Sequence, residues 1–372
     1  MKGDNIAMLK RQPLKLAENR VSRLYTGGFL LDSFLGKRRK SDGHFPEDWI
    51  GSTVIASNRA QDQKDQEGLS DVLTLEGKKQ SLKSILLQEA EDLLGIEHYQ
   101  KYGSNPGVLV KLLDSSMRLP IQVHPSKTLA KKYFNSPFGK TEAWLVIATR
   151  NIDGVEPFIL LGFREGISRE IFSDMIKSNN SEALEQCLHR IPVKEGDVYL
   201  IEAGVPHAIG PGNLILEIQE PTDITLRAEK NVGAVIIGEE VAFQGLSLQE
   251  YLDCYNFESL SITNVLEKYR MLSRVIKDLP GYSKEQWLIS YADTSNFELR
   301  SIVIVSSWEM EGDRGFHILI IINGTGNLSG PGFSQAINKG DYFFIPCHQS
   351  YQINNLGVLP LQAITCWPPK LE

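Results

Sequence analysis

The stretch "VKEGDVYLIEAGVPHAI", residues 193–209, decides the fold expected for this chain. A Gly-Asp turn leads into a short apolar run, and a Gly/Pro turn then places His207 at the start of the next apolar run. The stretch "INKGDYFFIPCHQSYQI", residues 337–353, repeats this order of turn, strand, break and hairpin. Two copies of one strand-and-hairpin unit predict two β-rich halves of similar construction.

The repeated order resembles the second sequence motif of the cupins, which ends on a metal-binding histidine. Counting from Gly196 places Gly204 at the second glycine of the motif and His207 at the histidine. Counting from Gly340 places Tyr351 where the histidine should stand. The resemblance implies a mainly β fold of two cupin-like jelly-roll barrels, of which the first binds metal and the second has lost the ligand.

Composition limits the classes of function. The chain has 372 residues, which is long enough for two domains, and its 42% hydrophobic and 23% charged residues are ordinary for a globular protein. A net charge of −7 argues against nucleic acid or an anionic membrane as the main partner. The apolar runs at 301–305 and 317–322 are too short to cross a bilayer and are typical of buried strands.

The chain has four cysteines, none of them in a CxxC pair, and this indicates a reducing compartment. Residues 1–20 contain no apolar core of a secretory signal. We therefore expect a cytoplasmic protein.

Strand patterns alternate with three helical segments. Short strands are expected in 20–57, including "YTGGFLL" at 25–31, and then in 107–163, 197–227 and from about 285 onward. Apolar spacing predicts a helix over 81–94 with Ser81 as its N-cap. Two helices are expected in 167–190, as an insertion, and one in 247–255, between the halves.

These patterns predict three regions. Residues 1–240 form a catalytic, metal-binding cupin domain with its helical insertion, residues 241–284 form a bridging segment, and residues 285–372 form a cupin-like domain without a metal site.

His207 needs partners if it binds metal, and two earlier stretches offer them. In "LPIQVHPSK" (119–127), strand alternation points Gln122 and His124 the same way, and in "GKTEAWLVI" (139–147) it does the same for Lys140 and Glu142. Nitrogen and oxygen donors of this kind suit Zn²⁺, one ion per chain, and would also accept Mn²⁺, Co²⁺ or Fe²⁺. The alternative is that His124 is a surface histidine and that Glu142 pairs with Lys140 on a rim.

Beyond His207, the stretch "NLILEIQEPTDITLR" (213–227) alternates cleanly. Ile215, Glu217 and Gln219 share one face, and Asp223 and Arg227 continue a polar face. We expect this polar face to line the interior near the metal, where water or a polar ligand must satisfy it. The alternative is an outer face in contact with solvent.

Together, "VLVKLLDSSMRLPIQVHPSK", "GKTEAWLVI" and "GVPHAIGPGNLILEIQEPTDITLR" resemble the successive signature blocks of type I phosphomannose isomerases. The resemblance covers residues 20 to 227 and continues weakly in the C-terminal half. It implies a zinc site made by a set of four side chains: Gln122, His124, Glu142 and His207.

The resemblance also implies interconversion of mannose 6-phosphate and fructose 6-phosphate through a cis-enediolate. Arg227 then has an active-site role, and Lys140 and Glu217 line the same pocket. By chemistry alone, Arg227 can stabilise enediolate charge, and the proton can be carried by Glu217, Lys140 or a metal-bound water. The sequence does not choose among these carriers.

The chain departs from the family pattern mainly at the phosphate end of the pocket. It has Leu119-Pro120 where the family usually has Leu-Ser, and Leu226 where a tyrosine precedes the arginine. The block after Arg227 lacks the usual basic residue, since Lys230 is out of register. The sequence therefore leaves two alternatives open: the same isomerisation on another, unphosphorylated sugar, and a non-catalytic cupin that senses a sugar.

Overall fold

The computed structural model describes residues 12–57, 66–74, 76–233, 235–312 and 314–371. Of the N-terminal stretch in which we see no secretory signal, residues 1–11 lie outside these ranges. No helix within them is both long enough and apolar enough to cross a bilayer. The fold is mainly β, as the sequence predicts.

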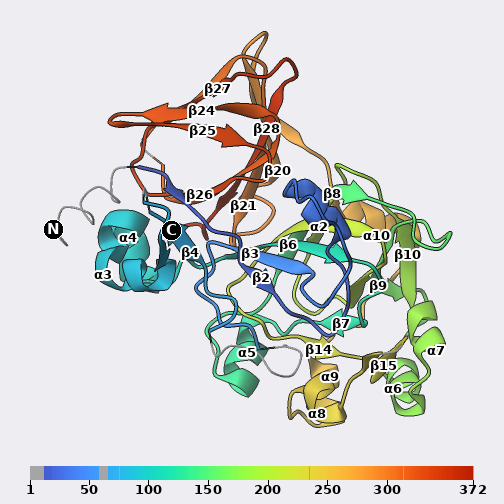
Figure 1. Ribbon diagram of the computed structural model, residues 1–372. Helices are drawn as coiled ribbons and strands as arrows, with labels where there is room; N and C mark the ends of the chain where they lie inside the picture. The colour runs from blue at the N-terminus through green and yellow to red at the C-terminus, as the bar shows by residue number, and fades with distance from the viewer. Residues whose placement is uncertain (1–11, 58–65, 75, 234, 313, 372) are drawn as a thin grey trace.

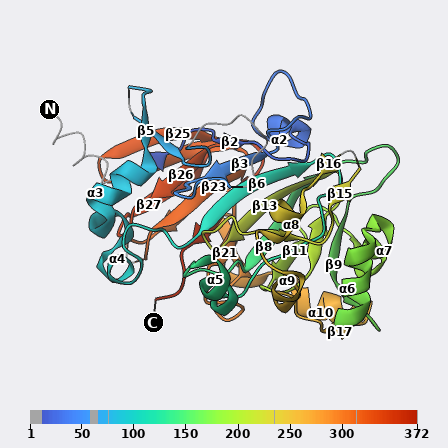
Figure 2. The same cartoon turned by 90° about the horizontal axis from the view of Figure 1, so that it is seen from below.

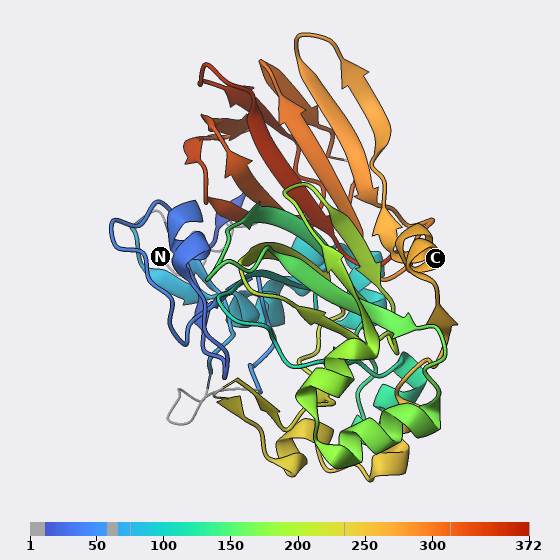
Figure 3. The same cartoon turned by 90° about the vertical axis from the view of Figure 1, so that its right-hand side faces the viewer.

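Four larger β-sheets among the described residues lie one above another (Figures 1 and 3). Sheet I contains, in spatial order, β10 (Leu188–Pro192), β9 (Phe158–Arg164), β12 (His207–Ile209), β7 (Gln122–Val123) and β14 (Leu226–Arg227), with β17 (Ser259–Leu260) beside β9. Sheet II contains β18 (Arg270–Met271), β11 (Val198–Ile201), β8 (Glu142–Thr149), β13 (Asn213–Gln219), β6 (Leu109–Ser115), β3 (Glu47–Ile50) and β2 (Arg20–Val21).

Sheets III and IV belong to the C-terminal half, drawn in orange and red in Figure 1, except for the N-terminal strand β1 of sheet III, which is blue. Sheet III contains β1 (Leu14–Lys15), β26 (Tyr342–Ile345), β23 (His317–Asn323), β28 (Leu361–Trp367), β21 (Glu298–Ile304), β20 (Ser283–Ile289) and β19 (Arg274–Leu279). Sheet IV contains β22 (Ser307–Met310), β27 (Tyr351–Asn355), β24 (Thr325–Gly330) and β25 (Phe333–Asn338). Two short hairpins complete the strands: β4 (Asp71–Leu73) with β5 (Lys79–Ser81), and β15 (Asn231–Val232) with β16 (Val235–Ile236).

The helices lie at the edges of this stack. They are α2 (Phe29–Phe34), α3 (Leu82–Leu94), α4 (Ile96–Tyr102), α5 (Lys127–Phe134), α6 (Arg169–Ser178), α7 (Ser181–Gln186), α8 (Glu239–Phe243), α9 (Leu248–Asp253) and α10 (Ile262–Tyr269). Helices α3 and α4 lie at the opposite end of the molecule from α6 and α7 (Figure 2). Phe172 of α6 and Tyr251 of α9 pack with Leu160 of sheet I, so these helices cover the outer face of that sheet.

The four predicted helices are confirmed. Helix α3 begins after Ser81, whose side chain accepts a hydrogen bond from the backbone N–H of Ser84 as an N-cap. Helices α6 and α7 form within 167–190, although the last residues of that stretch already belong to β10. Helix α9 forms within 247–255.

Sheet II is buried on both faces. On β13, Leu214, Leu216 and Ile218 pack with residues of sheet III, whereas Ile215 packs with residues of sheet I. Sheets III and IV enclose a further core around Ile302. The result is two β-sandwiches, I with II and III with IV, joined through the contact between II and III. The four sheets are hydrogen-bonded separately in the described residues and do not join into closed barrels.

The strand expected at "YTGGFLL" is wrong, because helix α2 begins there. The carboxylate of Asp114 on β6 accepts hydrogen bonds from the backbone N–H groups of Gly28 at 2.9 Å and Leu31 at 3.0 Å. These are the donors that the first turn of a helix leaves without partners. Gly28 has a φ of 128°, and a Cβ on Gly27 would lie 1.9 Å from the carbonyl oxygen of Asp114. The glycine pair thus permits a contact that local periodicity does not reveal.

The chain crosses between the two sandwiches at both ends of the first one. Strand β1 pairs with β26 in sheet III, and β2, only a few residues later, pairs with β3 in sheet II. Strand β19 lies within the stretch 241–284 that we expected to bridge the halves, yet it forms the outer strand of sheet III. The bridging part of that stretch therefore ends before β19.

Asp48 lies buried in the contact between sheets II and III. Its carboxyl group accepts hydrogen bonds from the Tyr342 hydroxyl at 2.7 Å and from the backbone N–H of Asn19 at 2.8 Å. Both of these donors are neutral, and burial raises the pKa of Asp48 from 3.8 to about 6. The neutral form is thus favoured in the folded chain more than in the unfolded chain.

This asymmetry predicts a pH-dependent stability. Because the folded pKa is raised, the contribution of Asp48 is fully present below about pH 4 and is lost as pH rises through about 6, by about 3 kcal/mol in all. Asp48→Asn stays neutral at every pH and can keep both hydrogen bonds. The stability of Asp48→Asn relative to wild type, measured by thermal unfolding, should therefore rise between pH 4 and pH 8. Asp278→Asn, at an exposed carboxylate, should show no such trend, and a pH-independent difference for Asp48→Asn would contradict the assignment.

Candidate functional site

The site lies between the facing surfaces of sheets I and II. On sheet I, the register places His207, Gln122 and Arg227 side by side on three neighbouring strands, β12, β7 and β14. On sheet II, it places Lys111, Glu217 and Trp144 side by side on β6, β13 and β8. Residues opposite one another in register share a face of the sheet, so each row presents its side chains as a group.

A pocket opens between these rows and encloses about 630 Å³, its open mouth included. Its charged and polar lining consists of Arg23, Tyr25, Glu47, Lys111, Gln122, Lys140, Glu217, Asp223, Thr225 and Arg227. Its apolar lining consists of Leu24, Leu113, Met117, Leu119, Pro120, Val235 and Ile237.

The polar faces predicted from 213–227 are thus interior. Glu217, Asp223 and Arg227 all line the pocket and are buried, which rules out the alternative of an outer face in contact with solvent. Gln219 is buried as well, and its amide donates to the backbone carbonyls of Glu220 and Thr222, so it braces the turn after β13.

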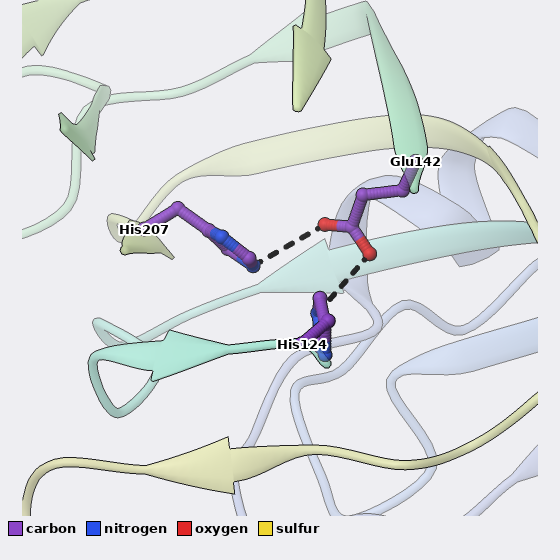
Figure 4. Close-up of side chains that lie close together, drawn as sticks. All are labelled: His124, Glu142 and His207. Atoms are coloured by element: carbon purple, nitrogen blue, oxygen red, sulfur yellow. Dashed lines mark ion pairs between the residues drawn. The ribbon is translucent and has the colours of Figure 1, made fainter. Parts of the chain in front are cut away.

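His124, Glu142 and His207 converge beside the pocket (Figure 4). His124 Nε2 lies 3.2 Å from Glu142 Oε2, and His207 Nε2 lies 3.3 Å from Glu142 Oε1. One ligand atom from each residue lies within 4.8 Å of the others, and all three side chains are buried. The structure therefore brings together three of the four ligands expected from the sequence, and it rules out a surface position for His124 and a rim position for Glu142.

Both imidazoles are held in one orientation by the backbone. His124 Nδ1 donates to the carbonyl of Ile224 at 2.9 Å, and His207 Nδ1 donates to the carbonyl of Val205 at 2.8 Å. The proton of each ring therefore sits on Nδ1, and each Nε2 presents a lone pair to the cluster. Burial lowers the pKa of His207, and burial with the neighbouring Lys140 charge lowers the pKa of His124 to about 3.

Two of the converging atoms have no hydrogen bond. Glu142 Oε1 and His207 Nε2 are fully buried without a donor, and each offers only lone pairs to the other. Buried acceptors of this kind are costly unless a donor or a cation lies between them. Two neutral imidazoles and a carboxylate, each held from behind, are the donor set that a divalent transition metal takes up.

Gln122, the fourth expected ligand, lies next to His207 in the register and lines the pocket. It is half-buried, in contrast to the three converging residues.

Lys140 contacts the cluster directly. Its ammonium group lies 2.7 Å from Glu142 Oε2 and 2.8 Å from His124 Nε2, and its side chain is buried. Burial alone would raise the pKa of Glu142, but the positive charge of Lys140, with the adjoining histidines, outweighs it and holds that pKa well below its ordinary value. Glu142 is thus kept as a carboxylate.

Glu217 is another buried carboxyl group of sheet II. Its surroundings shift its pKa in the opposite direction from that of Glu142. Trp144 Nε1 donates to Glu217 Oε1 at 3.1 Å, and Lys111 Nζ lies 3.2 Å from Glu217 Oε2. Burial raises the pKa of Glu217, and Lys111 offsets only part of that effect. Glu217 therefore holds a proton more readily than an exposed glutamate does.

Arg227 faces the pocket from sheet I. Its guanidinium donates to the carbonyl of Thr225 at 3.1 Å, and burial lowers its pKa to about 10, so the group stays charged at neutral pH. Asp223 is the nearest carboxylate in electrostatic terms and acts to keep Arg227 charged.

Four pocket residues were not found from the sequence. Arg23 donates to Glu47 at 2.9 Å and lies 3.4 Å from Asp223, and the Tyr25 hydroxyl donates to Glu47 at 2.6 Å. Lys111 is the fourth. Its signal was available, because it is the lone lysine in the apolar run "VLVKLLDSS", and a lysine in a fully buried strand must face a carboxylate or a ligand.

The second sandwich holds a different cluster at the corresponding place. The Tyr351 hydroxyl bonds His317 Nε2 at 2.7 Å, and His317 stacks on Trp367 with ring centroids 4.1 Å apart. Beside them Arg300 pairs with Glu285 at 2.8 Å and also with Glu298. Tyr351 and His317 are thus hydrogen-bonded to each other, and Arg300 is paired with two glutamates of the same sandwich.

Comparison with known proteins gives consistent results from sequence and from fold. No family model matches the chain. A probable mannose-6-phosphate isomerase of Bacillus subtilis, GmuF, is 27% identical over 262 residues, which cover 68% of this chain and 74% of that protein.

Solved structures match nearly the whole chain. A mannose 6-phosphate isomerase from Bacillus subtilis superimposes with a TM-score of 0.73 at 23% identity, covering 96% of this chain and 99% of that one. A zinc-bound mannose 6-phosphate isomerase superimposes with a TM-score of 0.72 at 15% identity, covering 96% and 100%. The chain is thus similar in sequence, and over nearly its whole length in fold, to proteins named mannose-6-phosphate isomerases.

Proposed function

We propose that the protein is a metal-dependent aldose–ketose isomerase that interconverts mannose 6-phosphate and fructose 6-phosphate. One observation carries the proposal: a buried His–Glu–His cluster contacts Lys140, which lines a pocket together with Glu217 and Arg227. The homologous proteins named for this activity support the choice of reaction.

The metal in this proposal is zinc, one ion per chain, held by His124, Glu142, His207 and Gln122. Two imidazoles with a carboxylate are typical zinc ligands, and a zinc-bound structure of the same fold supports the choice. Mn²⁺, Co²⁺ or Fe²⁺ would fit the same donors, because affinity alone does not select among them. When bound, the ion supplies positive charge that polarises and orients the oxygens of the sugar.

Glu217 carries the proton between C2 and C1 in this mechanism. Two of the buried carboxyl groups of sheet II have opposite pKa directions, low for Glu142 and high for Glu217. A carboxyl group with a raised pKa is suited to accept and return a proton near neutral pH, whereas a permanent carboxylate is suited to hold a cation.

Arg227 stabilises the negative charge that develops on the enediolate oxygens. It faces Glu217 across the pocket from a neighbouring sheet, and its charge is fixed before the sugar arrives. A preorganised cation of this kind lowers the energy of the charged transition state more than that of the neutral sugar.

An isomerase acting on an unphosphorylated sugar is the second candidate, and the lining of the pocket is compatible with it. Arg23, Lys111 and Lys140 are each paired with carboxylates, and Leu24, Met117 and Val235 add an apolar wall. Such a lining suits a neutral end of a sugar as well as a phosphate. A non-catalytic sugar sensor is the third candidate, and the presence of both Glu217 and Arg227 in the lining of one pocket argues against it. Assay of the protein with phosphorylated and free aldoses, with and without chelator, separates the three.

The wider assignments belong to the same proposal. The two sandwiches are cupin-like jelly rolls, the first catalytic and the second, from about residue 285, without a metal site. The partner is a small sugar or sugar phosphate, and nucleic acid and membrane are not partners. The location is cytoplasmic.

The first prediction concerns the metal. Wild type resupplied with zinc should hold about one ion per chain by elemental analysis. His124→Ala and His207→Ala should each lose it, because the three ligands that remain bind zinc far more weakly. His44→Ala, at an exposed histidine, should keep the metal. Zinc-resupplied wild type without stoichiometric metal would refute the site.

The second prediction concerns Arg227. Arg227→Ala should keep its fold and metal, bind the sugar only modestly more weakly and lose turnover by about 10²- to 10³-fold. Arg227→Lys should restore little, because an ammonium group cannot reproduce the planar fork of donors. Arg38→Ala, at an exposed arginine, should turn over like wild type. Wild-type turnover in Arg227→Ala would rule out this role.

The third prediction concerns proton transfer. Glu217→Gln should keep zinc but lose turnover by about 10²- to 10⁴-fold, together with the exchange of the aldose C2 proton for solvent deuterium that NMR detects. Glu267→Gln, at an exposed glutamate, is the matched control. If Glu217→Gln exchanges this proton at the wild-type rate, another group carries it.

A further inference from the structure

His124 Nε2 offers a single lone pair. The other ring nitrogen, Nδ1, donates to the carbonyl of Ile224 and so carries the ring proton. Lys140 can only donate, and its ammonium group lies 2.8 Å from His124 Nε2. In the structure, this lone pair is therefore used by Lys140.

A metal in the cluster needs the same lone pair. Nδ1 of His124 is turned toward a backbone carbonyl, whereas Nε2 lies 3.2 Å from Glu142 Oε2, the oxygen that Lys140 also contacts at 2.7 Å. An sp² nitrogen lone pair cannot accept a hydrogen bond and bind a metal at the same time. The Lys140 ammonium group and a metal ion would thus compete for the lone pair of His124 Nε2.

We propose that Lys140 and the metal exclude each other at His124, so that metal binding moves the Lys140 ammonium off the cluster and toward the carboxyl groups of the pocket that its side chain already lines. The inference rests on the metal site of the proposed function. Lys140 lines that pocket together with Glu217 and Asp223, whose carboxyl groups are acceptors for the displaced ammonium. Metal loading then places a cation among the sugar-binding groups.

Lys140 also explains how the ligands stay in place without an ion. Glu142 is fully buried, and a buried carboxylate that loses its cationic partner is strongly destabilising. Lys140 compensates Glu142 until the metal takes over that task. The two arrangements share the carboxylate and differ in which cation neutralises it.

The test compares Lys140→Met with Lys111→Met. Both variants remove a buried ammonium from the same pocket, but the ion pair of Lys111 is with Glu217 and not with the cluster. After treatment with chelator, zinc affinity is measured by competition with a chromophoric chelator. Groups bonded to metal ligands alter affinity by about 10- to 100-fold, so we expect Lys140→Met to bind zinc at least about tenfold more tightly than wild type. Lys111→Met should bind like wild type.

A second readout is thermal stability. Chelator-treated Lys140→Met should melt at a lower temperature than chelator-treated wild type, because Glu142 has lost its partner, and zinc should close most of that gap. Lys111→Met should show the same difference from wild type with zinc as without it.

The outcomes separate this inference from the proposed function. If wild type takes up no zinc, the proposed metal site is wrong and this inference falls with it. If wild type and Lys140→Met bind zinc with equal affinity, the metal site stands and the exclusion is wrong. Equal tightening in both lysine variants would indicate general charge repulsion and would also overturn it. Should Lys140→Met fail to fold, a structure of zinc-loaded wild type decides: an ammonium still within hydrogen-bond distance of His124 Nε2 refutes the proposal, and one displaced toward Glu217 supports it.

Discussion

The burial of sheet II on both faces is the constraint on which the site depends. One face packs on sheet III through an aliphatic core, and the other faces sheet I. Glu142 and Glu217 stand on the second face, in a layer with little access to solvent. A carboxylate in such a layer must find its compensation among neighbouring side chains or in a bound cation.

The two carboxyl groups solve this problem differently, and the difference gives them different chemistry. Glu142 lies among Lys140 and two histidines, which favours the charged form. Glu217 has one lysine and an indole N–H, which do not fully offset its burial. Neighbouring positions of one sheet can thus serve as a cation ligand and as a proton carrier, without any difference in residue type.

The parts of the site that the sequence predicted are those set by strand alternation. The spacing in "QVH" and "KTE" placed His124 and Glu142 on strand faces that could meet in one interior. The Gly/Pro turn placed His207 at the start of the next strand. Alternation also put Glu217 and Arg227 inside. These inferences hold because side-chain direction along a strand has a fixed period, whatever the strand packs against.

The parts that could not be predicted depend on contacts between distant residues. Helix α2 forms where a strand was expected, because Asp114 from another strand satisfies its first turn. Arg23 enters the pocket through its pairing with Glu47 and Asp223, which are remote from it in sequence. The resemblance to jelly rolls likewise did not reveal that β1 and β19 would form the two outer strands of sheet III.

The path of the first described strands has a consequence for how this architecture can be divided. Leu14 and Lys15 pair with β26 in sheet III, and Arg20 and Val21 pair with β3 in sheet II. No single cut between the sandwiches therefore yields two complete units, because a C-terminal fragment would lack its outer strand and leave the backbone of β26 open along one edge. An unpaired strand edge of this kind invites association with other chains. To exchange the C-terminal sandwich between related proteins, β1 would have to be exchanged together with the strands from β19 onward. One continuous segment of chain is therefore not enough for the exchange.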